Sequence, residues 1–307
     1  MPIELTNFTV WGRQWFADGW EGLRRFCSEQ EIHGIELLAA GATAETAPPG
    51  DLIAGVHLRS LGSWLPLVGL QVPCYGEAGR RYQAVADYSE LVRLRADELR
   101  RAAFCEPAYA VWHANYALAP DTPRPAQTPG NEGFLELLSR LVRDVLGEYE
   151  PPFALVFENA YGIGLDPEES GTAAGFVRSL GKADAGLCLD TGHHLNRLRQ
   201  IGREDAACRE LLRIAAGLER NGAQARVVHL HWTPPQMVPP QDEGKDPGDF
   251  FAAGDQHRPL TDPHVAQVIS ALAPKYLVHE MGAMSLAEHA AWLRAQSAAA
   301  RGNADAR

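Results

Sequence analysis

Several features are scarce or missing in this sequence, and each absence narrows its function. The 307 residues include five cysteines, with no Cys-x-x-Cys pair, which argues against a disulfide framework or a thiolate zinc site and favours a reducing cytoplasm. No run of about 18 apolar residues occurs, so no membrane-spanning helix is expected. A basic segment followed by an apolar one is missing from the start of the chain, so no secretory signal is expected. The net charge of -11 argues against a broad nucleic-acid surface.

The chain does contain a repeated alternation of short apolar strands and helical patterns. Strands are predicted at residues 3–10, 34–38, 53–58, 109–112, 153–157, 187–190, 225–228 and 276–278. Helices are predicted at 20–30, 80–103, 133–146, 167–180, 204–218, 261–272 and 286–296. Such an alternation predicts an all-parallel sheet closed into a (β/α)8 TIM barrel, a single α/β domain over residues 1–296. Residues 297–307 are expected to form a disordered tail.

Titratable side chains stand at or next to the ends of six predicted strands. They are His57, His113, Glu158, Asp190, His229 and Glu280. In such barrels the carboxyl ends of the strands carry the chemistry, and buried charge is costly unless it is paired or bound to metal. One such residue could be a rim side chain bonded to a loop amide, whereas six together favour one shared metal site.

The segment GLCLDTGHHLN, residues 186–196, brings two candidate ligands close together. An apolar strand ends at Asp190, and a turn through Thr-Gly leads to His193, which would place two hard ligands side by side. The same residues also fit a capped helix, with Asp190 or Thr191 as the N-cap and with His193 and His194 on the surface. The segment alone leaves both interpretations open.

The order of these motifs resembles the xylose-isomerase-like TIM barrel superfamily, in particular the AP endonuclease family 2 pattern typified by endonuclease IV. The matching segments are VHLRS with His57, VWHANY with His113, VFENAYG with Glu158, LDTGH with Asp190 and His193, VHLHW with His229, GDQHRPL with Asp255 and His257, and VHEMG with Glu280. The resemblance covers nearly the whole barrel and implies a set of nine metal ligands. Histidines among oxygen donors, without cysteine, suit Zn, Mn or Fe, and nine ligands imply two or three divalent ions.

The family pattern also implies how the ligands are shared. One ion would be held by His57, His113 and Glu158, which bridges to a second ion held by Asp190, His229 and Glu280. A third ion would be held by His193, Asp255 and His257. In an extended segment Asp255 and His257 would point the same way, but a turn is the alternative because Gly254 and Pro259 bracket the pair.

Two loops depart from the DNA-cleaving members of that family. Residues 61–76 carry no charge, and they are interpreted as an apolar wall over a small substrate or as a subunit contact in an oligomer. A packed loop with neither role is an equally good interpretation. Residues 232–254 are rich in proline and net acidic, which would repel a phosphodiester backbone.

Four side chains near the candidate ligands are predicted to bind substrate: Arg59, Trp64, His231 and Arg258. The two arginines could bind a phosphate or a carboxylate of the substrate, and a structural ion pair is an equally good interpretation for each of them. His231 shares a strand face with His229 and could reach the pocket, whereas His279 is expected to face away.

These features favour a multinuclear metal-dependent hydrolase that attacks a small sugar- or phosphate-containing substrate, such as a phosphoester, with a metal-activated water. The alternative is a sugar or sugar-phosphate isomerase or epimerase, with Glu158 and Glu280 as the acid/base pair around one metal ion. An AP endonuclease acting on DNA ranks below both, because the chain is acidic and residues 61–76 lack cationic groups.

Overall fold

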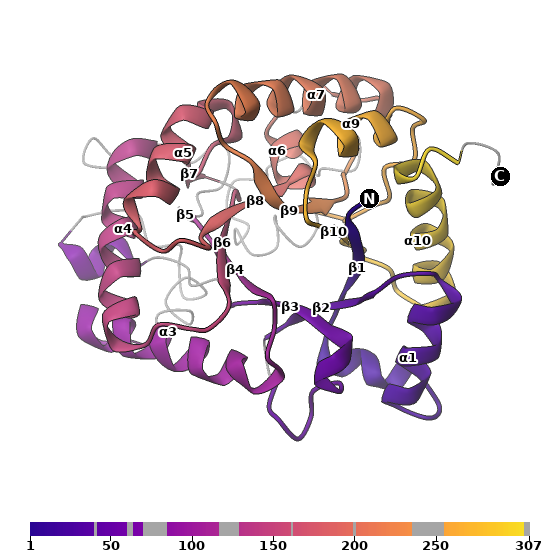
Figure 1. The fold of residues 1–307 in the computed structure, drawn as a ribbon, viewed down its shortest axis with the longest axis horizontal. Helices are drawn as coiled ribbons and strands as arrows, with labels where there is room; N and C mark the ends of the chain where they lie inside the picture. The colour runs from indigo at the N-terminus through magenta and orange to yellow at the C-terminus, as the bar shows by residue number, and fades with distance from the viewer. Residues whose placement is uncertain are drawn as a thin grey trace, which may run out of the picture.

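A closed barrel of parallel strands forms the centre of the molecule. The computed structural model describes residues 1–39, 42–59, 64–69, 85–116, 129–160, 162–198, 201–234 and 255–303. Around the barrel the strands follow the order β1, β10, β9, β8, β6, β4, β3 and β2, and helices surround them (Figure 1). The predicted (β/α)8 barrel is therefore confirmed.

The barrel strands are β1 (Ile3–Phe8), β2 (Gly34–Leu38), β3 (Ile53–His57), β4 (Tyr109–His113), β6 (Ala154–Glu158), β8 (Gly186–Asp190), β9 (Ala225–Leu230) and β10 (Tyr276–His279). The α-helices are α1 (Trp20–Glu29), α3 (Tyr88–Ala102), α4 (Asn131–Glu148), α5 (Ser170–Ser179), α6 (Thr191–Arg197), α7 (Glu204–Arg220), α9 (Val265–Leu272) and α10 (Leu286–Ala300). Short 3-10 helices are η1 (Val10–Trp15), η2 (Gly50–Leu52), η3 (Leu65–Val68), η4 (Ala103–Cys105) and η5 (Pro167–Glu169). Strands β5 (Asn115–Tyr116) and β7 (Ile163–Gly164), which the sequence did not predict, pair antiparallel beside the barrel.

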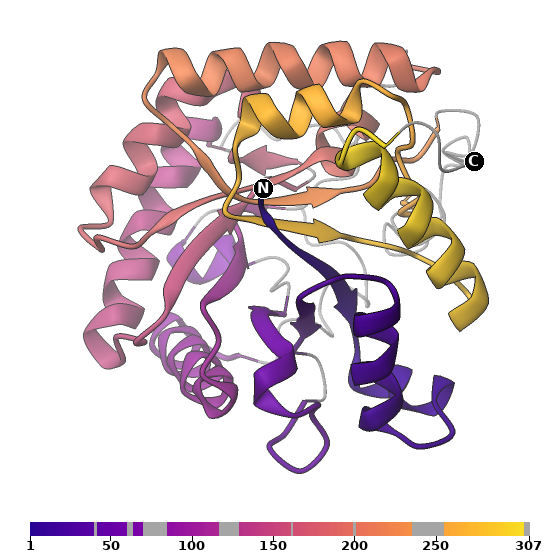
Figure 2. The same cartoon turned by 45° about the vertical axis from the view of Figure 1, so that its right-hand side comes forward.

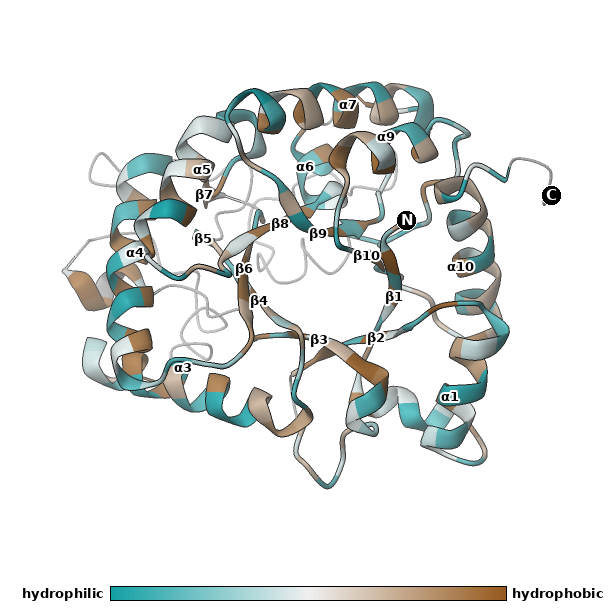
Figure 3. Cartoon of the chain, viewed as in Figure 1, coloured by the Kyte–Doolittle hydropathy of each residue, from teal (hydrophilic) through white to brown (hydrophobic). Residues whose placement is uncertain are grey.

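The strands are mostly apolar because both of their faces are buried. Their outward side chains pack against the helices in one large core. Figure 3 shows hydrophobic residues along the strands and on parts of the surrounding helices. Their inward side chains form a second, smaller core inside the barrel: Leu5, Tyr109, Val111, Ala154, Val156, Cys188, Val227, Tyr276 and Val278. This inner core fills the barrel and forms the floor beneath the carboxyl ends of the strands.

The closing helix differs from the sequence prediction. It continues to Ala300, past the boundary predicted at residue 296, and the structure describes the chain as far as residue 303. Residues 297–303 therefore belong to the fold rather than to a disordered tail, while 304–307 lie outside the described residues. Most of the predicted loops at 61–76 and 232–254 also lie outside them, apart from 64–69 and 232–234. Within the described part of the chain, no helix combines the length and apolarity needed to cross a bilayer.

A buried ionic network explains why the closing helix extends. Helix α10 lies beside β1 and β10 (Figures 1 and 2), and the Arg301 Nε that follows it is 2.7 Å from Glu4 Oε1 on β1. His279 Nε2 on β10 lies 3.1 Å from Glu4 Oε2. Burial alone would raise the pKa of Glu4, but hydrogen bonds from His279, Arg301 and Ser297 lower this pKa from 4.5 to about 2. Glu4 thus joins the first strand, the last strand and the last helix.

We expect Glu4 to make the stability of the fold depend on pH. A depressed pKa in the folded state means that the contribution is fully present above about pH 4.5 and is lost as the pH falls toward 2. The shift corresponds to a contribution on the order of 3 kcal/mol at neutral pH. Urea unfolding of Glu4→Gln and of the parent chain should show a difference in the free energy of unfolding that narrows as the pH is lowered from about 6 to about 3. A gap of constant size would contradict this assignment.

Candidate metal centre

The carboxyl ends of β3, β4, β6, β8 and β9 place the predicted ligands around one buried point. Strand pairing puts His113 level with Glu158 and Asp190 level with His229. Glu158, Asp190 and His229 are fully buried, and Glu280 directly after β10 is 8% exposed. The strand ends that the sequence singled out therefore do meet at one end of the barrel.

Glu158 lies at the middle of this cluster and uses both of its oxygens. Its Oε2 lies 2.7 Å from His113 Nε2 and 3.1 Å from His57 Nε2. Its Oε1 lies 3.0 Å from His229 Nδ1. Each of His57, His113 and Glu158 offers a ligand atom within 4.8 Å of the others. Both oxygens of Glu158 thus face histidines, and its role as a bridging metal ligand stays a prediction.

His229 connects Glu158 to the opposite side of the site. Its Nδ1 lies 3.1 Å from Glu280 Oε2 and 3.7 Å from Asp190 Oδ2. Ligand atoms of Glu158, Asp190, His229 and Glu280 all fall within 4.8 Å of one another. Three oxygen donors and one imidazole form a compact set that suits a divalent transition metal.

The Asp-Thr-Gly-His segment serves the helix and the site together. Asp190 is the N-cap of α6, because its Oδ1 accepts a hydrogen bond from the His193 backbone N–H at 2.6 Å. Its other oxygen, Oδ2, faces the centre. Thr191 Oγ1 donates to the carbonyl oxygens of His229 and His231, which fastens β8 to β9. The capped-helix interpretation is therefore correct for Asp190, and metal binding by its Oδ2 stays a prediction. His194 is buried and directed away from the centre, with its Nε2 2.8 Å from Glu210 Oε1.

A third group of ligands lies at the rim and includes a histidine that the family pattern did not assign to metal. His231, Asp255 and His257 offer ligand atoms within 4.8 Å of one another. The rings of His231 and His257 stack, with centroids 4.0 Å apart and planes 4° apart. His193 Nε2 lies 3.2 Å from Asp255 Oδ2, so the predicted member His193 also contacts the group.

The sequence carried a signal for His231 in the turn that follows the neighbouring strand β8. Gly192 in the Thr-Gly-His turn has no side chain, and a Cβ at this position would overlap the His231 ring. His231 is fully buried, with Nε2 3.0 Å from Asp190 Oδ2. The glycine therefore makes room for an imidazole beside the centre.

Asp255 and His257 point into the site for a different reason from the one predicted. The segment is not extended, because His257 has a φ of 43°, in the left-handed region that residues other than glycine seldom adopt. The conformation is held by hydrogen bonds from Gly282 N–H to the His257 carbonyl and from Gln256 N–H to Thr233 Oγ1. His257 Nε2 lies 3.1 Å from Asp255 Oδ2. Backbone strain at such a position is typical of functional sites.

Three residues predicted to bind substrate make structural contacts. Arg59 Nε lies 3.3 Å from Glu98 Oε1, and Trp64 is buried against Phe134 with ring centroids 5.6 Å apart. The Arg258 guanidinium lies 5.5 Å from the centroid of the Trp292 ring. A role for these side chains in substrate binding stays a prediction, as does the metal-binding role of the cluster.

Two buried side chains of the site were missed from the sequence. Glu36, in the middle of the apolar strand β2, is 1% exposed, and its Oε1 lies 3.1 Å from His229 Nε2. Cys188, which faces inward on β8, lies within 4.8 Å of ligand atoms of Glu158 and His229. Burial raises the pKa of the Cys188 thiol. A lone charge within an apolar strand was the available signal for Glu36.

The charges at the centre hold one another in place. Burial would raise the pKa of Glu158, but His113, His57 and His229 lower it well below its usual value. Burial would lower the pKa of His57, yet Glu158 raises it to about 9. His113 is the exception, because burial lowers its pKa despite the contact with Glu158. Glu158 is therefore ionised at neutral pH.

The donor set fits divalent metal ions. The site contains five buried or nearly buried carboxylates, which are Glu36, Glu158, Asp190, Asp255 and Glu280. Their ion pairs within the described residues are all with histidines, and none is with Lys or Arg. Two buried atoms of the site, Glu280 Oε2 and His231 Nδ1, have no partner with hydrogen-bond geometry among the described residues. Buried anions and unsatisfied donor atoms that point at one volume are what metal ligands require.

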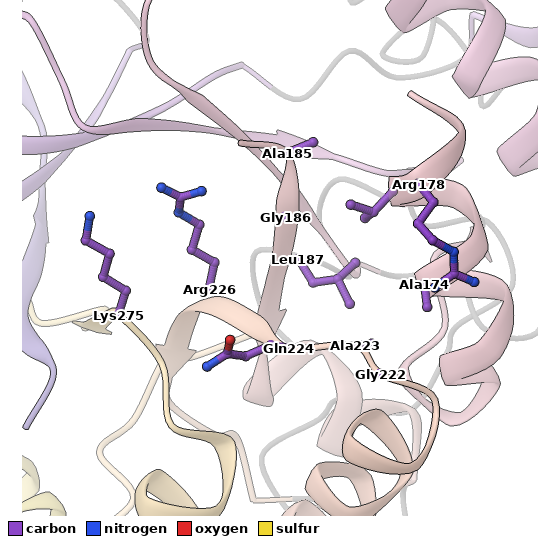
Figure 4. Close-up of a pocket in the computed structure, with 11 residues that line it drawn as sticks. Ala174, Arg178, Ala185, Gly186, Leu187, Gly222, Ala223, Gln224, Arg226 and Lys275 are labelled. Atoms are coloured by element: carbon purple, nitrogen blue, oxygen red, sulfur yellow. The ribbon is translucent and has the colours of Figure 1, made fainter. Parts of the chain in front are cut away.

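A separate cavity of about 440 Å³ lies away from this chemistry, at the amino ends of β8 and β9 (Figure 4). Its lining includes Gly186, Arg226 and Lys275. In barrels of this type that end contributes to stability, while the opposite end carries the reaction. We therefore assign the candidate site to the strand ends and not to this cavity.

Comparisons with known proteins show the fold. No protein-family model and no curated protein matches the chain. A sugar phosphate isomerase/epimerase from Parabacteroides distasonis aligns over 98% of this chain and 95% of its own, with a TM-score of 0.51 and 10% identity. The probable 3-DHS dehydratase AsbF from Bacillus anthracis aligns over 95% of this chain and 97% of its own, with a TM-score of 0.54 and 10% identity.

A third solved structure, a D-psicose 3-epimerase determined in the presence of D-fructose, aligns over 97% of this chain and 99% of its own. Its TM-score is 0.50 and its identity is 12%. Identities this low show a shared fold and leave the activity open. These solved structures share the barrel fold of this chain, which is the fold that the resemblance carried by the sequence motifs implies.

Proposed function

We propose that this chain is a metal-dependent isomerase or epimerase of a small sugar or sugar phosphate. The observation that carries the proposal is the placement of two carboxylates against the same nitrogen of one imidazole. Glu158 Oε1 and Glu280 Oε2 lie 3.0 and 3.1 Å from the same atom, His229 Nδ1. They come from β6 and from the end of β10, which are not neighbours in the barrel. A sugar carbon held between them would have a carboxylate on each side.

Two flanking carboxylates suit the transfer of a proton next to a carbonyl. One carboxylate removes the proton from the carbon adjacent to the carbonyl, and the electron pair of that C–H bond moves to give an enediolate. The other carboxylate returns a proton to the same carbon from the opposite face, which inverts its configuration and restores the carbonyl. Return of a proton to the neighbouring carbon gives the isomer instead.

The residues at the centre would also hold the ion. Asp190 and His229, with Glu158 and Glu280, supply the four donors described above. A bound divalent ion would polarise the carbonyl oxygen and stabilise the developing negative charge. Asn159 holds this arrangement rigid, because its side-chain amide exchanges two 2.9 Å hydrogen bonds with the Asp190 backbone.

The shared fold supports this proposal over the hydrolase that the sequence favoured. Two of the three solved structures described above bear the names of sugar isomerases or epimerases, and none bears the name of a hydrolase. The proposal therefore adopts the alternative that the sequence left open. The expectations of a small-molecule substrate and of no nucleic-acid partner are retained within it.

A second candidate remains the hydrolysis of a small phosphoester by several metal ions. Two further ligand groups favour it, namely His57 with His113 on Glu158, and His231 with Asp255 and His257. A single-ion isomerase needs neither group. Neighbouring ions that share a carboxylate suit attack by a metal-bound hydroxide.

We expect the purified enzyme, supplied with Mn²⁺ or Zn²⁺, to exchange a carbon-bound proton of a ketose or ketose phosphate with solvent. Incubation in D2O and NMR would reveal deuterium at the carbon next to the carbonyl. Glu158→Gln and Glu280→Gln each keep an oxygen donor but lose the base, so exchange should fall by about 10²-fold or more. Metal content is measured in each variant to separate loss of the base from loss of the ion.

Glu210→Gln is the matched control, because Glu210 also contacts a histidine, His194 at 2.8 Å, but lies outside the centre. It should exchange at the parent rate. Cleavage of small phosphoesters or of an abasic duplex, without exchange on any sugar of the panel, would contradict the isomerase and support hydrolysis.

We also expect more than one transition-metal ion per chain. The double change Asp255→Ala with His257→Ala should remove about one ion, because it deletes two of the three ligand side chains of the rim group. Thermal stability in chelator should hardly change, since neither side chain belongs to the apolar core. Elemental analysis after purification without chelator gives the stoichiometry. An unchanged metal content in the double variant would exclude the rim group as a site.

A further inference from the structure

A carboxylate from the far side of the barrel contacts the central histidine. Glu36 lies on β2, and β1 and β10 separate that strand from β9, which carries His229. Even so, Glu36 Oε1 and Oε2 lie 3.1 and 3.2 Å from His229 Nε2. The side chain therefore reaches across the interior of the barrel to the nitrogen that faces away from Glu158 and Glu280.

A tyrosine from the inner core holds this carboxylate. The Tyr109 hydroxyl donates a 2.8 Å hydrogen bond to Glu36 Oε2, and Tyr109 is fully buried. Its ring packs against that of Tyr276, with centroids 4.8 Å apart. Gly55 on the neighbouring strand β3 makes room for the ring, because a Cβ at this position would overlap it. Glu36 is thus fixed from below by a rigid part of the core.

The two nitrogens of His229 consequently have different surroundings. Nε2 faces Glu36, and Nδ1 faces Glu158 and Glu280. A carboxylate that accepts a hydrogen bond from one ring nitrogen fixes the ring orientation and the tautomer, and leaves the other nitrogen to bind metal. We propose that Glu36, held by Tyr109, is a positioning residue that presents His229 Nδ1 to the metal centre. This inference rests on the metal centre of the proposed function.

Direct ligation by Glu36 is the competing interpretation, because Glu36, His57 and His229 also have ligand atoms within 4.8 Å of one another. The orientation of His57 disfavours it. His57 Nε2 faces Glu158 Oε2 at 3.1 Å, and its Nδ1 lies 3.0 Å from the Leu58 carbonyl oxygen. Neither nitrogen is directed at Glu36, and only His229 would be left to complete such a site with it.

The test measures Co²⁺ binding to the metal-stripped full-length chain by competition with a chromophoric chelator, together with the visible absorption spectrum of the bound Co²⁺. Glu36→Gln keeps the volume but not the charge, and we expect an affinity about 10-fold or more lower, with a shifted spectrum. Tyr109→Phe removes only the hydroxyl that holds Glu36, and a smaller loss in the same direction is expected. The number of ions bound at saturation should stay the same in both variants.

Glu4→Gln is the matched control. It breaks another buried Glu–His contact, Glu4 with His279 at 3.1 Å, that touches none of the candidate ligands. It should bind Co²⁺ like the parent chain, and an equal loss of affinity in this variant would assign the effect to general destabilisation and overturn the inference. A parental affinity and spectrum in Glu36→Gln would also overturn it, as would the loss of one ion, which would make Glu36 a ligand. Failure of the parent chain to bind Co²⁺ at all would overturn the metal centre, and with it both proposals.

Discussion

The burial of many like charges in one place is the constraint on which the rest of this structure depends. Carboxylates from β2, β6, β8, the segment after β9 and the end of β10 converge on a volume from which water is largely excluded. Their mutual repulsion in a low-dielectric interior would be prohibitive without compensating positive charge. In the described residues that positive charge comes from imidazole groups beside the carboxylates. Divalent ions would supply the positive charge instead as they bind, because a histidine that ligates a metal must be deprotonated. The apolar inner core and the closed barrel then serve to hold these groups against their repulsion.

Small residues and backbone contacts provide the precision that such a cluster needs. Gly192 leaves space for the ring of His231, and Gly55 leaves space for the ring of Tyr109. Thr191 joins β8 to β9, and Asn159 joins β6 to β8, through hydrogen bonds to the backbone at the ligands themselves. Positioning of this kind, by strands and not by loops, keeps ligands within the narrow tolerances of metal binding.

The sequence predicted the barrel because continuous apolar strands and helical periodicity are local signals, and it predicted the strand-end ligands because a charge that ends an apolar run is conspicuous. What it could not provide was contact between distant strands. Glu36 was passed over because a charge within a strand is not at its end, and only the closed barrel brings it to His229. His231 was assigned to substrate because strand alternation gives its direction but not its neighbours, Asp190 and His257. The extension of α10 was missed because its reason, the contact of Arg301 with Glu4, joins the two ends of the chain.

Two buried Glu–His pairs in the same barrel show how differently charge can be compensated. Glu4 and His279 lie at the outer side of β1 and β10, and Arg301 supplies a permanent positive charge to that pair. Glu36 and His229 lie inside, and within the described residues no Lys or Arg contacts them or the adjoining carboxylates. An arginine balances charge but cannot leave coordination positions open for a substrate, whereas a metal ion does both. The outer pair contacts a guanidinium, and within the described residues the inner pair contacts none. This difference is what the proposed site, with exchangeable ions and a sugar's oxygens, would require.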